Sequence, residues 1–422
     1  MMKSKNLLSL YFFVIFIYTA TPCNILSLVN YSGNIYTAIF PILFTLFMCL
    51  KFKVKLLDVR FLSIIGVLCL WNLIHLICTP NFKISPFPFL EVLIAYTIVS
   101  IYSKDLFVRF ENVAVFLSKV ALIGWVLCLI SHSTMLNLAY LFGSPGAKIS
   151  QSLYIFSVPL EANNVGFLLR NCGFSWEPGR FSCILILALF FNIVRTNFKI
   201  SDKNFLILLA ALISAQSTTG YIVFIIMISI YYLMTKKINF IYIAIAALLV
   251  VLVSTLPFMR DKILDLFSNS QDIESQVNEM IFLSKQGSID GYYVPQRFDG
   301  MMFQLINLEH APLLIGEGRD LTFFYLNKTM GFQIAVSEGL LSIIIQYGII
   351  IALCSYYMVF KSSRIFCTKC SFLFFVIFIM INFSYSLWEP PLIMALWMFG
   401  YFSKIKKINY ATNFNRNTIF QQ

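Results

Sequence analysis

Residues 61–78 read FLSIIGVLCLWNLIHLIC and contain no Asp, Glu, Lys or Arg. An apolar run of about 17 to 25 residues is long enough to cross a bilayer as an α-helix. Lys51, Lys53, Lys55 and Arg60 stand just before the run. Since Lys and Arg collect on the cytoplasmic side of membrane spans, this stretch predicts a transmembrane helix that starts in the cytoplasm.

The remainder of the 422-residue chain has the same character. It is 59% hydrophobic and only 12% charged, whereas a soluble domain normally carries about 25% charged residues. The mean hydropathy of +0.82 is too high for a single aqueous core to bury the apolar surface. A lipid bilayer is the solvent that fits this composition, so we expect an integral membrane protein.

Other apolar segments divide the chain into about 12 transmembrane helices. The expected segments are 7–26, 35–50, 61–78, 87–102, 113–131, 180–195, 205–217, 220–235, 239–257, 332–360, 371–388 and 391–403. They predict an all-α, polytopic protein with a single membrane domain over residues 1–422. Two connections stand out as long external loops, at about 132–179 and 258–331.

The basic residues predict the orientation of these helices. With the N-terminus inside, every even-numbered segment ends beside a basic cluster, including Lys104 with Arg109 and Lys236 with Lys237. Both termini are then cytoplasmic. The net charge of +12 is explained as a topology signal and an attraction to anionic lipid, and we do not expect nucleic acid as a partner.

Residues 170–180, RNCGFSWEPGR, close the first long loop and open a helix. Pro178 suits the first turn of a helix, and an outward-facing helix N-terminus favours an anion. Arg170 and Arg180 add two planar guanidinium groups suited to phosphate, and Glu177 adds a carboxylate. The alternative is that Glu177 only caps the helix and that the arginines anchor to lipid headgroups.

Three further groups lie at the expected outer level of the membrane. Ser217 and Thr218 belong to a tight turn, SAQSTTG at residues 214–220, whose small residues allow helices to approach closely. Arg297, His310 and Arg319 lie in the second long loop, where an arginine could neutralise a diphosphate and the histidine could act as a base. Plain structural roles remain open for each group, including an ordinary hairpin turn and a packing histidine.

Two carboxylates accompany helix ends at the same level. Glu338 is near the start of a long apolar segment, and Glu389 precedes Pro390 and Pro391 at a helix junction. An ionisable residue at membrane level is a functional candidate by default, although pairing with a basic loop residue explains it nearly as well. At the expected inner face, Cys367 and Cys370 form a C-x-x-C that we interpret as two reduced thiols rather than a redox centre.

The polar groups therefore converge on the outer face, where ATP is not available. The sequence contains no P-loop and no metal-ligand cluster, so we expect no cofactor and no metal. A reaction there needs a substrate that is already activated, and a polyprenyl-diphosphate-linked sugar meets that need. Arginines would stabilise the departing diphosphate, and a carboxylate or histidine would deprotonate the acceptor hydroxyl.

The order of these motifs resembles the bacterial O-antigen polymerase and O-antigen ligase superfamily. The matching pieces are GFSWEPGRF at residues 173–181, STTG at 217–220, Arg297 followed by PLLIGEG at 312–318, and SEGLL at 337–341, which would open a long helix. Together they cover residues 165–345, about half of the chain.

The resemblance implies a GT-C-like, metal-independent glycosyltransferase of the bacterial inner membrane. It would join undecaprenyl-diphosphate-linked oligosaccharide repeat units at the outer face in lipopolysaccharide assembly, and it leaves open a chain-length regulator as a partner. The diphosphate would be held best by Arg170, Arg180 and Arg297. The ligase branch has a histidine late in the large loop, whereas His310 comes early, which favours a polymerase.

Two other functions remain open from the sequence. An O-antigen ligase would use the same lipid-linked donor. A lipid-linked oligosaccharide flippase or transporter would normally carry internal repeats and helices broken near the midplane, and no repeat is visible in this sequence.

Overall fold

The computed structural model describes most of the chain. The described residues, with gaps between them, are 4–20, 35–78, 82, 84–145, 149–160, 169–235, 292–293, 297–310, 312–318, 333–334 and 339–405. Side chains are described for fewer positions, and those of Arg297 and His310 lie outside this set. The apolar segment 239–257, Arg319 and Glu338 lie outside the described residues altogether.

Each expected apolar segment except residues 239–257 contains a described helix. The helices are α1 (Ser4–Ala20), α2 (Ile35–Lys51), α3 (Val59–Cys78), α4 (Phe87–Tyr102), α5 (Leu106–Ile130), α7 (Pro178–Thr196), α8 (Lys203–Ala215), α9 (Thr218–Thr235), α15 (Ser342–Phe366), α16 (Leu373–Ser384), α17 (Pro391–Trp397) and α18 (Phe399–Phe402). A short 3₁₀ turn, η1 (Ser103–Asp105), joins α4 to α5.

The lengths and composition of these helices make the chain an all-α membrane protein. In the described part of the chain, 5 helical stretches are long and apolar enough to cross a bilayer: Val59–Cys78, Phe87–Ile130, Pro178–Thr196, Thr218–Thr235 and Ser342–Phe366. Shorter apolar helices such as α1 and α8 pack among them. The total of 12 spans and the GT-C-like arrangement stay predictions.

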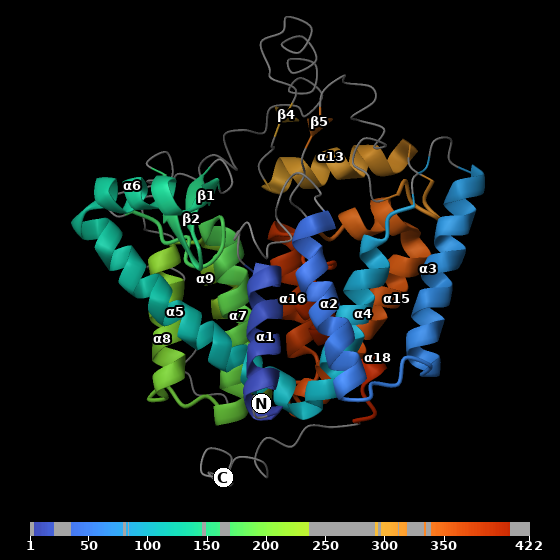
Figure 1. The fold of residues 1–422 in the computed structure, drawn as a ribbon, viewed down its shortest axis with the longest axis horizontal. Coiled ribbons are helices and arrows are strands. Elements are labelled where there is room, and N and C mark those ends of the chain that lie inside the picture. Colours follow the sequence, from blue (N-terminus) through green and yellow to red (C-terminus); the bar gives the residue numbers. More distant parts are fainter. Residues whose placement is uncertain are drawn as a thin grey trace, which may run out of the picture.

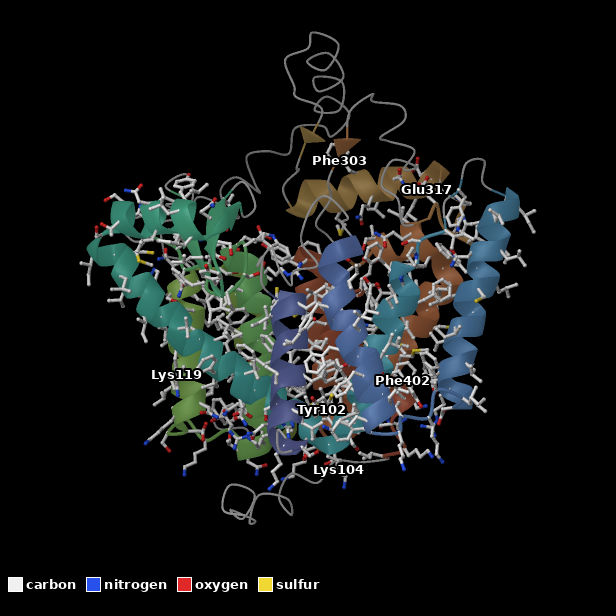
Figure 2. All side chains as sticks on the ribbon, viewed as in Figure 1. Tyr102, Lys104, Lys119, Phe303, Glu317 and Phe402 are labelled. Carbon is white, nitrogen blue, oxygen red and sulfur yellow. The ribbon has the colours of Figure 1, made fainter. Side chains whose placement is uncertain are left out.

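The helices stand side by side and have two distinct ends (Figure 1). At one end, which we call the basic end, α1 begins, α18 lies close by, and Lys104 projects (Figure 2). At the opposite end, which we call the loop end, α6 (His132–Phe142) and α13 (Arg297–His310) lie across the helix tips. The helical spacing of residues 294–310 predicts a helix there, and α13 confirms it.

The loop end also carries short strands that the apolar pattern of the sequence does not predict. In a three-stranded antiparallel sheet, β2 (Ser150–Leu153) pairs with both β1 (Ser144–Pro145) and β3 (Phe156–Pro159). A parallel pair joins β4 (Tyr292–Tyr293) to β5 (Gln333–Ile334). These strands are too short to show a convincing alternation of apolar and polar residues.

Phenylalanine rings fill the core near the basic end. Phe366 of α15 lies 4.5 Å from Phe107, 4.7 Å from Phe374 and 5.6 Å from Phe399, measured between ring centroids. Phe191 of α7 joins them at 4.9 Å from Phe107. Lipid is as apolar as these rings, so close aromatic packing, rather than escape from water, holds the helices together here.

Helix α15 differs from the expectation in two ways. It begins at Ser342 rather than opening at residues 337–341, because the N–H of Gly339 donates to the carbonyl oxygen of Asn382 on α16 (2.7 Å) instead of joining the helix. It is also broken at Gly348, where φ is 82°. The helix is therefore discontinuous near the loop end.

Candidate functional site

Helix α7 runs through the protein interior and starts at the loop end. Every residue from Pro178 to Val194 is buried. Glu177 is the N-cap residue with an extended backbone (φ −148°, ψ 153°), and Pro178 follows in the first turn, where a missing N–H costs nothing. The sequence-based start of this helix is therefore accurate, and its positive dipole end points toward the loop end.

Arg180 is held rigidly in the first turn of α7. Its side chain is buried at 9% exposure, and Nη2 donates to the carbonyl oxygen of Thr19 at the end of α1 (3.0 Å). The guanidinium carbon lies 3.7 Å from the centre of the Trp176 ring, a cation–π contact. One nitrogen and one face of the group are thus occupied by the protein, which fixes where this positive charge sits.

Arg170 reaches the same region from the loop that precedes α7. Its neighbour Asn171 anchors that loop to the α8–α9 turn, because the Asn171 N–H and Nδ2 donate to the carbonyl and hydroxyl oxygens of Ser214 (3.0 and 2.9 Å). Burial raises the pKa of the Cys172 thiol well above its usual range, and the charges of Arg170 and Glu177 act on it in opposite senses.

The turn before α9 packs directly on the first turn of α7. Ser182 Oγ donates to the carbonyl oxygen of Gly179 (2.6 Å) and lies 2.9 Å from the buried Ser217 Oγ. A Cβ on Gly220 would lie 2.7 Å from Ser182 Cβ, so only glycine allows this approach. The close approach expected for residues 214–220 is present. Thr218 is half-buried as the first residue of α9.

The loop at residues 385–390 completes this region. The sequence patterns single out only Glu389 there, with the two prolines that follow it. The loop joins α16 to α17, and a Cβ on Gly179 would overlap the Tyr385 hydroxyl. Just beyond the loop, the Leu392 N–H donates to Thr19 Oγ1 (3.4 Å). On the other side, Thr219 Oγ1 lies 2.6 Å from Ser384 Oγ. The contact to α16 thus comes from Thr219 rather than from Thr218.

We call the group formed by Arg170, Glu177, Arg180, Ser217 and Thr218 the loop-end cluster. The structure brings these five predicted residues together around the start of α7. Arg297 and His310 are the first and last residues of α13, above the helix tips. Nothing in the described residues tests their side chains, or Arg319 and Glu338.

The PLLIGEG stretch at residues 312–318 has a structural role, which its contacts with α3 and α15 show. The carbonyl oxygen of Ile315 lies 2.8 Å from Trp71 Nε1 and 3.0 Å from His75 Nε2 on α3. The Glu317 N–H donates to the carbonyl oxygen of Ile345 (2.6 Å), and the Ile349 N–H donates to that of Leu313 (2.9 Å). The stretch is therefore wedged between α3 and the break in α15, as expected for a turn rather than a nucleotide loop.

The loop-end cluster combines two arginines, one carboxylate and two hydroxyl groups. Arg180 lies in the first turn of α7, Arg170 belongs to the loop before it, and Ser217 and Thr218 stand at the adjoining turn, a combination that suits an anion. Among the residues that the structure describes, no three His, Cys, Asp or Glu side chains are grouped to hold a metal ion. Fold and site together define a polytopic, all-α membrane protein with an arginine-bearing polar cluster at one end.

Comparison with protein families, with curated proteins and with solved structures finds no match to this chain. Its function is therefore inferred from its own residues and geometry.

Proposed function

We propose that this chain is a bacterial inner-membrane glycosyltransferase that polymerises undecaprenyl-diphosphate-linked oligosaccharide repeat units at the outer face of the membrane. The loop end is then the outer face, and the basic end is cytoplasmic. The substrate's lipid tail lies in the bilayer beside the helices, its diphosphate meets the loop-end cluster, and its sugars extend beyond the helix tips.

The observation that carries this proposal is the fixed position of Arg180. A buried arginine at a helix N-terminus places two sources of positive potential at the membrane surface. Arg170 belongs to the loop before α7, which Asn171 holds against Ser214 at the end of α8. A leaving diphosphate develops negative charge as the glycosidic bond breaks, so preorganised cations at this depth favour the transition state.

Two alternatives use the same features differently. An O-antigen ligase would hold the same diphosphate but transfer the chain to a lipid A core. A lipid-linked oligosaccharide flippase is favoured by one observation, the break in α15, because discontinuous helices are common in transporters. That break lies six residues from the start of α15 and is filled by residues 313–315, which favours a structural joint at the loop end over a transport site at the midplane.

A gene-deletion strain tests the proposal. It is complemented with wild type, Arg170→Ala, Glu177→Gln or Arg297→Ala, with membrane abundance checked, and surface polysaccharide is resolved on a gel. Lys199→Ala, which removes an exposed charge at the basic end, is the control. We expect the deletion strain to show single repeat units on the lipid core. Wild type and the control should restore long chains, and the three site variants should not.

Other outcomes of the same experiment favour the alternatives. If no repeat unit reaches the lipid core in the deletion strain, a ligase or flippase explains the phenotype better. An unchanged distribution of chain lengths would contradict the polysaccharide function altogether.

A further inference from the structure

The loop at residues 385–390 carries a carboxylate, Glu389, that the loop-end cluster does not include. Helix α16 stops at Ser384, and Asn382 Oδ1 accepts a hydrogen bond from the Leu387 N–H (2.9 Å), which turns the chain out of the helix. Pro390 and Pro391 follow Glu389, and Pro391 begins α17. Two consecutive prolines restrict the backbone on both sides of their junction and limit the conformations open to Glu389.

The loop is attached to the same two elements that position Arg180. Its first residue, Tyr385, packs so closely against Gly179 that a Cβ there would overlap the Tyr385 hydroxyl, and Gly179 directly precedes Arg180 in the sequence. Three residues after Glu389, the Leu392 N–H donates to the Thr19 hydroxyl, while the Thr19 carbonyl oxygen accepts from Arg180. Thr19 therefore bridges the arginine and the start of α17. The loop that carries Glu389 is thus tied at both of its ends to the elements that hold Arg180, although Glu389 is more than 200 residues from Arg180 in the chain.

Glu389 is half-buried and is oriented by a hydrogen bond from α15. The Tyr347 hydroxyl donates to Glu389 Oε1 (3.0 Å). The Tyr347 ring lies 5.0 Å from the Trp71 ring, centroid to centroid, and Trp71 in turn donates to the wedged turn at Ile315. The carboxylate is therefore held by a rigid chain of contacts, as a group that must meet a substrate atom requires.

Two other described carboxylates at the loop end, Glu177 and Glu317, have structural roles. Glu177 is the N-cap residue of α7, and its backbone carbonyl oxygen accepts a hydrogen bond from the Phe181 N–H (3.1 Å). Glu317 is buried at 8% exposure, and its Oε2 accepts from Asn307 (3.3 Å). This hydrogen bond attaches the PLLIGEG stretch to α13.

We propose that Glu389 accepts the proton of the acceptor hydroxyl in the reaction proposed above, and this inference rests on that function. In the step, the hydroxyl O–H bond breaks and its proton passes to the Glu389 carboxylate. The acceptor oxygen forms the new bond to the anomeric carbon of the donor. The bond from that carbon to the diphosphate breaks, and undecaprenyl diphosphate leaves with the electron pair beside Arg170 and Arg180.

The test uses the purified full-length chain in liposomes with a synthetic undecaprenyl-diphosphate repeat unit. Glu389→Gln keeps the shape of the side chain but cannot take a proton. We expect its kcat to fall about 10²- to 10⁴-fold, the usual contribution of a general base, while its KM changes less than about threefold. Asp105→Asn, an exposed carboxylate change at the basic end, is the matched control and should leave both constants unchanged.

Tyr347→Phe supplies a second, milder readout that does not depend on losing the carboxylate. Removing the donor releases the carboxylate from the orientation that this hydrogen bond sets, so kcat should fall, by less than in Glu389→Gln, while KM stays nearly unchanged. The inference is overturned if Glu389→Gln keeps more than about a tenth of wild-type kcat, or if Tyr347→Phe leaves kcat at the wild-type value. If wild type itself makes no polymer, the proposed function fails first, and this inference fails with it.

Discussion

At the scale of single residues, the most completely bonded ionic group lies at the basic end, away from the proposed site. Glu111 of α5 is fully buried, and Arg195 of α7 contacts both of its oxygens (2.8 and 2.6 Å). Asn192 and Asn204 donate to Glu111 Oε1 (2.9 and 3.0 Å). This group ties α5, α7 and α8 together, so we assign it to stability rather than chemistry.

Removing the Glu111 charge should destabilise the protein strongly. Glu111→Gln leaves Arg195, which is 15% exposed, without its main counter-ion. Breaking a buried pair on one side costs about 3 to 5 kcal/mol. Thermal unfolding of the detergent-solubilised protein should show a clear fall in Tm, with Lys199→Ala as an unaffected control. Equal Tm values for Glu111→Gln and wild type would show that the pair contributes little.

The cysteine pair at the basic end gives a prediction about pH. The Cys370 N–H donates to Cys367 Sγ (3.1 Å) in the loop between α15 and α16. A hydrogen bond from the Cys370 thiol lowers the pKa of Cys367, and the same bond raises the pKa of Cys370. The thiolate form of Cys367 is therefore the more populated of the two near neutral pH.

Alkylation followed by mass spectrometry measures this difference. Cys367 should react before Cys370, and its rate should rise with pH at lower values than that of an ordinary thiol. Cys370→Ser replaces the thiol donor, so it should change the pH dependence at Cys367. Modification of Cys370 first, in the wild-type protein, would contradict the assignment.

At the scale of elements, the contact between α15 and the PLLIGEG stretch requires a glycine at residue 348. A Cβ on Gly348 would overlap the carbonyl oxygen of Leu314, and φ at Gly348 is 82°. Both the space and the backbone conformation demand glycine. Gly66 on α3 offers the opposite case, since no atom lies within 4 Å of a Cβ built there.

Gly348→Ala should therefore displace the wedged turn, whereas Gly66→Ala should not. We expect Gly348→Ala to lower the free energy of unfolding by about 2 to 4 kcal/mol and to expose residues 312–318 to proteolysis. Gly66→Ala should be neutral or slightly stabilising, because alanine favours helix. Limited proteolysis and Tm measurements on both variants make the comparison. Identical behaviour would mean that the turn is not wedged as described.

The elements also show where sequence reasoning reaches its limit. Long apolar runs and their flanking charges locate α3 and α7 to within a few residues, because a helix in lipid must satisfy its own backbone. Helix α15 is located less well, since it begins at Ser342 although the expected segment starts at residue 332. The start of α7 is likewise predictable, because Glu177 and Pro178 are typical of a helix N-terminus. By contrast, the position of Tyr385 against Gly179 depends on packing between distant helices, and no local pattern in one sequence records it.

At the scale of the whole molecule, charge and polar chemistry are separated between the two ends. Helix-flanking lysines such as Lys104 lie at the basic end, and the loop-end cluster, α6 and α13 lie at the other (Figure 2). The positive-inside rule then predicts a cytoplasmic basic end. This orientation is required by the proposed function, because undecaprenyl-linked repeat units are expected at the outer face.

Cysteine labelling in whole cells measures the orientation. In a cysteine-free background, Leu141→Cys on α6 should react with a membrane-impermeant maleimide added outside once the outer membrane is permeabilised. Lys199→Cys, between α7 and α8, should react only after the inner membrane is opened. The reverse pattern would place the loop-end cluster in the cytoplasm and contradict the proposed reaction.

Glycosyl transfer from a lipid diphosphate at the loop-end cluster is tested most directly with purified components. Wild-type protein in liposomes is supplied with a defined undecaprenyl-diphosphate repeat unit, and both products are followed. We expect a ladder of lengthened chains and one undecaprenyl diphosphate released for each new linkage, both lost in Arg180→Met. Intact repeat units, with no released diphosphate in an assay where the protein remains folded, would contradict the proposed function.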